Sequence, residues 1–174
     1  RAVNLGLVTP GTDIQDLATV FLNRGNLFGC LKQPDAEIGD YRRGTGIARK
    51  ALGEFHPALA DLFIAISEFL LKEGKKDSAM IYRRKALEIR ERSYPPCHPL
   101  LSAAYRDMGT FQLKTDNIDS ASIFYWKSLQ AVYTQPIPYS GFNTSLITDK
   151  YEFALTIFEL CRLNYNEYLR RHDE

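Results

Sequence analysis

The dipeptide His-Pro occurs at residues 56–57 and again at 98–99, and the segments that follow the two copies match at a spacing of 42 residues. In the overlay Phe63 meets Tyr105, and Ala79 meets Ala121. A fixed period of about 20–50 residues is typical of helical repeat arrays, in which each unit buries its apolar face by packing on its neighbour. This period constrains the fold more than any other feature of the chain.

Each copy has the pattern of two helices joined by a turn. Apolar side chains recur at steps of three to four residues over 58–73 and 100–115, which is the spacing of one helix face. Gly74 and residues 115–117 interrupt the pattern, and second helices are predicted over about 77–92 and 118–133. Proline suits the first turn of a helix, so His56 and His98 are predicted to lie at loop-to-helix junctions.

An imperfect unit precedes the two clear copies. Its first helix is predicted over 14–31 and its second over 41–52, where the run ending at Leu52 is aligned with the run ending at Leu87. On that alignment the offset is 35 residues, so about seven extra residues are expected between the helices of this unit. Gly44 then matches Ala79 and Ala121, and close packing of two helices is the expected reason for it.

The predicted fold class is all-α, a right-handed α-solenoid of helical hairpins with a long C-terminal capping helix. We expect an N-terminal extension over 1–13 and three helix pairs over 14–55, 56–97 and 98–133. A loop containing Pro136, Pro138 and Gly141 follows over 134–145, and a helix over 146–174 ends the chain. Because residue 1 is Arg rather than Met, the chain is expected to be a piece of a longer protein.

The spaced positions Tyr105, Met108-Gly109, Ala121, Tyr125 and Ser128 resemble the tetratricopeptide consensus. The 42-residue spacing, the His-Pro openings and the run 86–91 are similar to the kinesin-light-chain subgroup of these repeats. The stretch 94–101 also resembles the C-terminal helical repeats of SET/MYND lysine methyltransferases. The resemblance implies helical hairpins with a binding groove on the first helices. Arg83 departs from the pattern, because it occupies the position that Tyr125 fills with an aromatic ring.

Charge and cysteine usage exclude several classes of protein. The net charge of +1, from 22 Lys and Arg against 21 Asp and Glu, argues against a dedicated nucleic-acid binder. Cys30, Cys97 and Cys161 are far apart and odd in number, which favours reduced thiols in a cytoplasmic protein over a disulfide framework. The chain has no run of about 18–20 apolar residues, so no membrane span is predicted.

Motifs that carry catalysis are not found in the sequence. The Gly44-Thr45-Gly46 segment is too short to cradle a phosphate. Cys97 and His98 are neighbours in sequence, and adjacent residues rarely chelate one ion. We therefore expect no catalytic residue, no metal and no cofactor.

The resemblance implies a binding groove on the first helix of each unit. An extended peptide could bury an apolar anchor there while Asn23 and Asn26 bond its backbone. Relatives that capture a chaperone's terminal carboxylate have Lys where Leu22 and Ile64 stand, so no such clamp is expected. The predicted partner-binding positions are Asn23, Asn26, Ile64, Glu68, Lys72, Arg106, Thr110 and Lys114, flanked by Leu22, Leu71 and Leu113.

The function expected from these features is that of a non-enzymatic adaptor or scaffold that binds a protein or peptide. The alternatives are the helical regulatory region of a larger enzyme, such as a SET/MYND-type methyltransferase, and a structural subunit that associates through its aromatic C-terminal helix. The basic stretch 72–92 is interpreted as a solvated helix face, with a patch for an acidic partner or RNA as the other reading.

Overall fold

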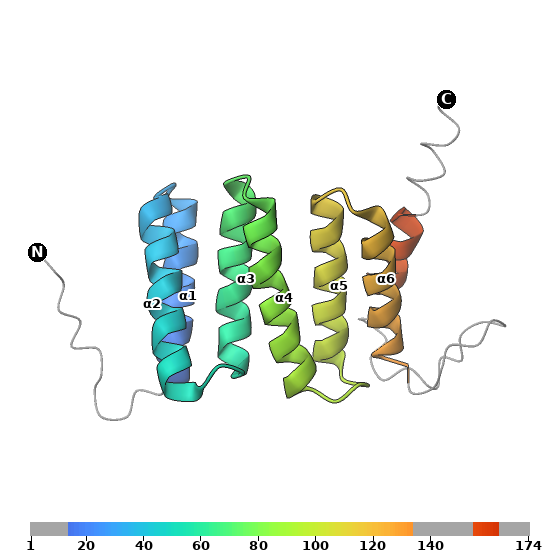
Figure 1. Ribbon diagram of the computed structural model, residues 1–174, viewed down its shortest axis with the longest axis horizontal. Helices are drawn as coiled ribbons and strands as arrows, with labels where there is room; N and C mark the ends of the chain where they lie inside the picture. Colours follow the sequence, from blue (N-terminus) through green and yellow to red (C-terminus); the bar gives the residue numbers. More distant parts are fainter. Residues whose placement is uncertain (1–13, 134–154, 164–174) are drawn as a thin grey trace, which may run out of the picture. The chain divides into compact units, whose positions relative to one another are not determined.

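The computed structural model describes residues 14–133 and 155–163, and these residues are all-α (Figure 1). The helices are α1 (Ile14–Cys30), α2 (Pro34–Leu52), α3 (Pro57–Lys72), α4 (Lys76–Ser93), α5 (Pro99–Lys114) and α6 (Ile118–Gln130). Residues 155–163 are also helical, within the helix predicted over 146–174. The predicted extension 1–13, the loop 134–145 and the rest of the C-terminal helix lie outside the described residues.

The chain divides into two compact units, Arg1–Ile89 and Arg90–Glu174. In the first unit α1 and α2 form a hairpin, and α3 packs beside that hairpin and against α4 (Figure 1). In the second unit α5 and α6 form a hairpin, and the helical residues 155–163 cover α6. The predicted all-α fold of paired helices is therefore confirmed.

The repeat keeps one period of 42 residues through every described hairpin. Helices α2, α4 and α6 begin at Pro34, Lys76 and Ile118, and helices α1, α3 and α5 end at Cys30, Lys72 and Lys114. The predicted start of the second helix at Tyr41, with about seven inserted residues before it, was therefore wrong. Those residues form the first two turns of α2.

The early start of α2 has a local cause. Lys32 adopts a left-handed backbone (φ 56°), and the Gln33 N–H donates to the carbonyl of Phe28, which closes α1. Pro34 then occupies the first helical position, where its fixed φ favours a helix and its missing N–H has no partner to lose. Asp35 and Glu37 place negative charge in the first turn, where the helix dipole stabilises it.

Glycines allow the helices of a hairpin to approach closely. A methyl group at Gly109 would lie 2.8 Å from the ring of Tyr125, and one at Gly25 would collide with the ring of Tyr41. Gly44 packs on its own hairpin and on the next one, because a methyl group there would lie 2.9 Å from Phe21 Cβ of α1 and 3.1 Å from Leu62 of α3. Close packing at Gly44 is confirmed, although its repeat equivalents are Ala86 and Ser128 rather than Ala79 and Ala121.

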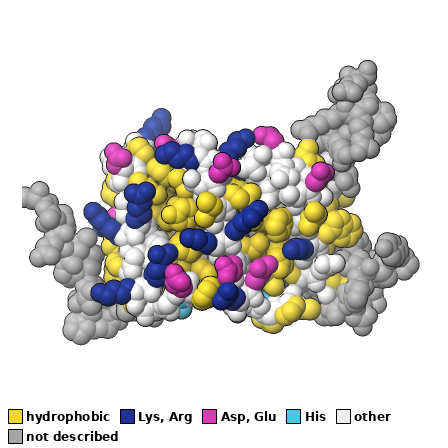
Figure 2. All heavy atoms as spheres, viewed as in Figure 1, with side chains coloured by type: hydrophobic (Ala, Val, Ile, Leu, Met, Phe, Trp, Pro, Cys, Tyr) yellow, Lys and Arg dark blue, Asp and Glu magenta, His cyan; other side chains and the backbone are white. Residues whose placement is uncertain are grey.

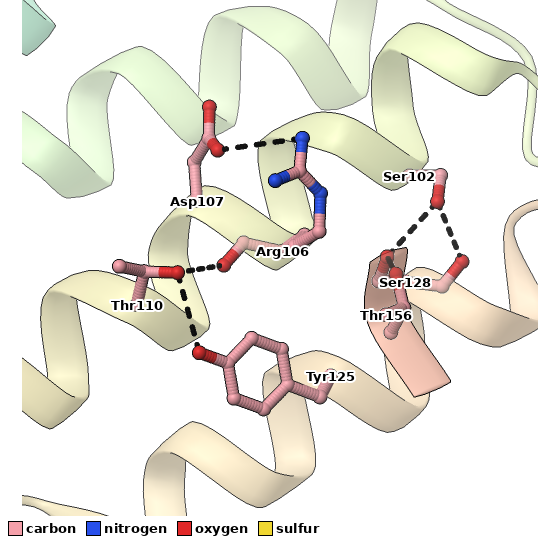
Figure 3. A network of polar contacts seen from close by, with 7 residues as sticks. All are labelled: Ser102, Arg106, Asp107, Thr110, Tyr125, Ser128 and Thr156. Atoms are coloured by element: carbon pink, nitrogen blue, oxygen red, sulfur yellow. Dashed lines mark hydrogen bonds and ion pairs between the residues drawn. The ribbon is translucent and has the colours of Figure 1, made fainter. Parts of the chain in front are cut away.

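Each unit has its own apolar core. Leu59, Leu62, Phe63 and Ile66 of α3 form the centre of the first core and pack with Tyr41, Ala86 and Ile89. In the second unit Tyr125 and Leu129 of α6 pack with Leu160 and Leu163. Buried hydroxyls tie that packing together, because Ser128 Oγ lies 2.9 Å from both Ser102 Oγ and Thr156 Oγ1 (Figure 3).

His56 and His98 lie at the helix junctions, as predicted. His56 Nδ1 accepts a hydrogen bond from the Ala58 N–H at 3.3 Å, and His98 Nδ1 accepts one from the Leu100 N–H at 3.1 Å. Both residues have extended backbones and are followed by proline, so each caps a backbone donor that the helix leaves unpaired.

Candidate functional site

A pocket of about 360 Å³ opens on the first unit between α1, α2 and α3. Four of the predicted groove residues, Asn26, Ile64, Glu68 and Lys72, lie in its wall. Asn23 is exposed on α1 outside that wall. The remaining predicted residues, Arg106, Thr110 and Lys114, belong to α5 in the second unit.

The pocket has an apolar part, its floor, and polar side chains around it, of which Glu37 and Tyr41 are buried and the others form its rim. Leu22 of α1 and Ile64 and Ala65 of α3 supply the apolar surface, and all three side chains are half-buried. The polar groups come from all three helices and are Asn26, Glu37, Tyr41, Asp61, Glu68 and Lys72. This lining offers both apolar surface and hydrogen-bonding groups to a segment of another protein.

A polar bond recurs in each hairpin between a groove position and the residue 15 places later. The Tyr41 hydroxyl donates to Asn26 Oδ1 at 2.7 Å, and Thr110 Oγ1 lies 3.2 Å from the Tyr125 hydroxyl (Figure 3). The Arg83 guanidinium makes the equivalent contact with the Glu68 carboxylate. Asn26 therefore has a structural role besides any contact with a partner, which the sequence did not indicate.

Arg83 is buried rather than solvated. The basic stretch 72–92 was interpreted as an outer helix face, but Arg83 is only 5% exposed and forms an ion pair with Glu68. Ser67, next to Glu68, replaces the glycine of the other hairpins and donates its hydroxyl to the Ala79 carbonyl at 2.8 Å. The missing aromatic ring at position 83 was visible in the sequence, whereas the partner of Arg83, Glu68, could be identified only from the structure.

Glu37 is a pocket residue that the sequence did not single out. It is 6% exposed, and its carboxylate lies 3.4 Å from the Tyr41 hydroxyl and 3.7 Å from Lys72 Nζ. A methyl group at Gly29 would lie 2.9 Å from that carboxyl group, so glycine makes room for it. Burial raises the pKa of Tyr41 far above its ordinary value, and the charge of Glu37 raises it further.

The next turn of α2 contains a second buried acid. Asp40 accepts two hydrogen bonds from the Arg24 guanidinium, and its side chain is almost fully buried. Arg43 Nη1 lies 3.4 Å from the same carboxyl group. Asp40 is thus satisfied by cations from α1 and α2, while the cation beside Glu37 is the exposed ammonium group of Lys72 at 3.7 Å.

In the second unit the predicted groove residues make local contacts. Arg106 lies 3.9 Å from the Asp107 carboxylate, and its carbonyl accepts from Thr110 Oγ1 at 3.1 Å (Figure 3). Lys114 is exposed at the end of α5. Burial raises the pKa of Tyr125, whose hydroxyl is bonded to Thr110.

Two further pockets are related to each other by the repeat. One, of about 410 Å³, contains Glu91, Tyr105 and Lys127, and the other, of about 130 Å³, contains the equivalent Arg49, Phe63 and Lys85. The Tyr105 hydroxyl donates to Glu91 Oε1 at 2.9 Å. Burial, together with that bond and the negative charge of Glu91, raises the pKa of Tyr105 to about 12.

Charged side chains on the described surface are mixed. Figure 2 shows lysine and arginine side chains scattered among acidic and apolar ones on the face in view. Over residues 14–133 and 155–163, no group of three or more His, Cys, Asp or Glu side chains could hold a metal ion. No helix in the same ranges is both long and apolar enough to cross a membrane.

Paired helices at a constant 42-residue period define the chain as a tetratricopeptide-like helical repeat protein. It is 23% identical over 92 residues to Protein KINESIN LIGHT CHAIN-RELATED 1 of Arabidopsis thaliana, a match that covers 53% of this chain and 15% of that protein. The fold is similar to the crystal structure of BtubC (BKLC) from P. vanneervenii, with a TM-score of 0.68 and 15% identity. That likeness covers 90% of this chain and 59% of BtubC. No family model matches the sequence.

These similarities confirm the predicted resemblance to kinesin-light-chain repeats. The chain spans about 15% of the length of the plant relative and less than two thirds of the bacterial one. A repeat fold of this kind is typical of non-enzymatic proteins and is consistent with protein interaction.

Proposed function

We propose that the chain is a non-enzymatic adaptor or scaffold module that binds an extended segment of a partner protein in the pocket between α1, α2 and α3. The observation that carries the proposal is the pocket itself. Its floor of Leu22, Ile64 and Ala65 can bury an apolar anchor, and its rim offers side-chain donors and acceptors to a peptide backbone.

The contribution of each predicted residue differs. Ile64 and Leu22 supply burial, whereas Asn26, Glu68 and Lys72 supply polar contacts at the rim. Arg106, Thr110 and Lys114 are proposed as partner contacts of the second unit, where they occupy the repeat positions of Ile64, Glu68 and Lys72. Asn23, exposed on α1, is proposed as a contact beside the pocket.

The proposed location is the cytoplasm. Cys30, Cys97 and Cys161 are exposed free thiols, which suits a reducing compartment. The alternative of a regulatory region within a larger enzyme, such as a methyltransferase, rests on the resemblance of residues 94–101 alone. The buried Arg83 also removes one cation from the basic surface that an RNA or another acidic partner would use.

The test is selection of binders from a displayed library of random dodecapeptides on the whole chain. Asn26→Ala is a poor probe, because it also removes the acceptor of the Tyr41 hydroxyl. Ile64→Arg is better, because Ile64 is half-buried at the pocket floor and its repeat equivalent is Arg106, so the repeat accommodates arginine there. Ile81→Arg, at an exposed isoleucine of α4, is the matched control.

The proposal expects peptides that bind the wild-type chain and the Ile81→Arg variant but lose at least about tenfold in affinity on Ile64→Arg, the loss typical of a buried anchor. A selection that yields no binder, or only binders indifferent to Ile64→Arg, contradicts it. Circular dichroism and melting temperature show that both variants are folded.

A further inference from the structure

The carboxylate of Glu37 is a group in the pocket whose presence the repeat pattern does not explain. The repeat positions of Glu37 in the other hairpins are Ala79 and Ala121, and both alanines are fully buried. Gly29 shows the opposite change, because its repeat positions are Leu71 and Leu113. The first hairpin has therefore exchanged a leucine–alanine pair for a glycine–glutamate pair, and the space left by the leucine is occupied by a carboxyl group.

The repeat does not require an acid at this position. Hairpins with alanine at the position form in the same unit and in the second one. A buried carboxylate is costly unless a cation or hydrogen bonds compensate it. A buried acid that stands at a repeat position of alanine, and that lines a pocket, points to a role in binding.

The contacts of Glu37 leave its charge incompletely compensated. The Tyr41 hydroxyl has one proton, and its bond to Glu37 Oε1 at 3.4 Å is longer and weaker than its bond to Asn26 Oδ1 at 2.7 Å. The nearest cation is Lys72 Nζ at 3.7 Å, on a side chain that is 67% exposed. An exposed lysine at that distance is a weak and displaceable partner.

The surroundings of Glu37 are acidic. Asp61 and Glu68 line the same pocket, and Lys72 is the one cation among its lining residues. Arg83 neutralises Glu68 from the side of α4. Among the lining residues three acids thus stand against one cation, beside an apolar floor.

From this arrangement we propose that the pocket recognises a basic side chain, arginine or lysine, of the bound segment. The Glu37 carboxylate is the group that binds the positive charge of that side chain. This inference rests on the proposed function. The methylene stem of the basic residue lies against Leu22 and Ile64, and its cationic head takes the place of the Lys72 ammonium at Glu37. Lys72 is then a resident cation that the partner displaces.

The preference belongs to this pocket and not to the repeat in general. The second unit has Arg106 and Lys114 at the positions of Ile64 and Lys72, and Ala121 at that of Glu37. A groove with those residues suits an acidic or neutral segment.

The test uses the dodecapeptides that the selection yields on the whole chain. The expected peptides contain arginine or lysine at a fixed position, and replacing that residue by glutamine weakens binding by about tenfold or more. In the Glu37→Gln variant the basic and glutamine peptides bind equally well. Glu54→Gln, at an exposed acid outside the pocket, keeps the difference between the two peptides.

Two further variants separate Glu37 from a general effect on the fold. Gly29→Ala keeps the carboxyl group in the chain but displaces it, so it should also abolish the preference for the basic peptide. Lys72→Ala removes the competing cation, so the ratio between the affinities of the basic and the glutamine peptide should stay the same or increase.

The results that overturn the inference are distinct from those that overturn the proposed function. Two results refute the role of Glu37 but not binding in the pocket. In one, the peptides depend on Ile64 but contain no fixed basic residue. In the other, the peptides keep their preference for a basic residue in Glu37→Gln. If Lys72→Ala lowers the affinity of the peptides about tenfold, and the peptides contain acidic residues, Lys72 binds a carboxylate of the peptide instead. Absence of any binder that depends on Ile64 refutes the proposed function itself.

Discussion

At residue 83 the repeat departs from its own pattern, and the departure involves three side chains together. Where the other hairpins have glycine facing a tyrosine that bonds to Asn26 or Thr110, the middle hairpin has Ser67, Arg83 and Glu68. The sequence revealed the missing aromatic ring. The compensating carboxylate could not be identified, because many acids lie within reach of an arginine until side-chain directions are known.

The ion pair is asymmetric, and this asymmetry gives the first prediction. The Arg83 side chain is 7% exposed and the Glu68 side chain 35% exposed. Removing the carboxylate with Glu68→Gln leaves a buried cation and should cost about 2 kcal/mol of unfolding free energy, whereas Arg83→Met should cost about 1 kcal/mol or less. Urea denaturation of both variants measures the difference. Equal losses, or a larger loss for Arg83→Met, would contradict the burial argument.

Tyrosine ionisation gives a second prediction at the residue scale. The pKa of Tyr105 is raised from 10.0 to about 12, so the folded state disfavours its tyrosinate. The stability that this contributes is fully present below pH 10, the unfolded pKa, and is lost as the pH rises through about 12.

Ultraviolet absorbance of tyrosinate, followed from pH 9 upward in wild type and in Tyr105→Phe, measures that ionisation. The difference between the two curves should show a step near pH 12 or coincide with unfolding detected by circular dichroism. A step near pH 10 would mean that Tyr105 is not held by Glu91 and by burial.

At the scale of the helices, most of the prediction succeeded because a helical hairpin is specified locally. The His-Pro junctions and the apolar spacing of α3, α4, α5 and α6 located those elements from the sequence. The start of α2 was missed because Pro34, Asp35 and Glu37 have the composition of a loop, and Gly44 and Gly46 weaken the helical pattern. Glu37 occupies a repeat position at which the other hairpins have a buried alanine. This mismatch also obscured the correct alignment of the first unit with the other two.

The glycines provide a matched pair of substitutions for this scale. Gly109→Ala places a methyl group 2.8 Å from the Tyr125 ring and should cost about 1–3 kcal/mol through overpacking. Gly46→Ala, on α2 with no atom within 4 Å of the new methyl group, should stabilise the chain by about 0.5–1 kcal/mol. Thermal or urea unfolding of both variants tests the packing. A neutral Gly109→Ala would show that the hairpin is looser than described.

The histidine caps give a further prediction for helix α5. His98→Ala removes the acceptor of the Leu100 N–H and should cost about 1 kcal/mol, whereas His98→Asn should retain most of the cap, since asparagine is a favoured N-cap residue. Denaturation midpoints of the two variants measure the effect. If asparagine destabilises as much as alanine, the histidine acts through its stacking on Tyr94 instead.

For the molecule as a whole, the sequence predicted the class of fold and part of the candidate pocket. Asn26, Ile64, Glu68 and Lys72 follow from the repeat, since they occupy its groove positions. Glu37 does not follow from it, because its place in the pocket depends on the space at Gly29 and on the course of α2. Side-chain packing between helices creates such sites, and this packing cannot be deduced from the repeat pattern alone.

The central claim is that a partner segment lies in the pocket of the first unit. The most direct measurement is an amide chemical-shift map of the ¹⁵N-labelled chain, titrated with a peptide from the selection. The account predicts that the shifted amides cluster around Leu22, Asn26, Glu37, Ile64 and Glu68, and that Ile64→Arg abolishes the shifts. Shifts confined to the exposed face around Ile81, with those pocket amides unmoved by a peptide that still binds, would contradict it.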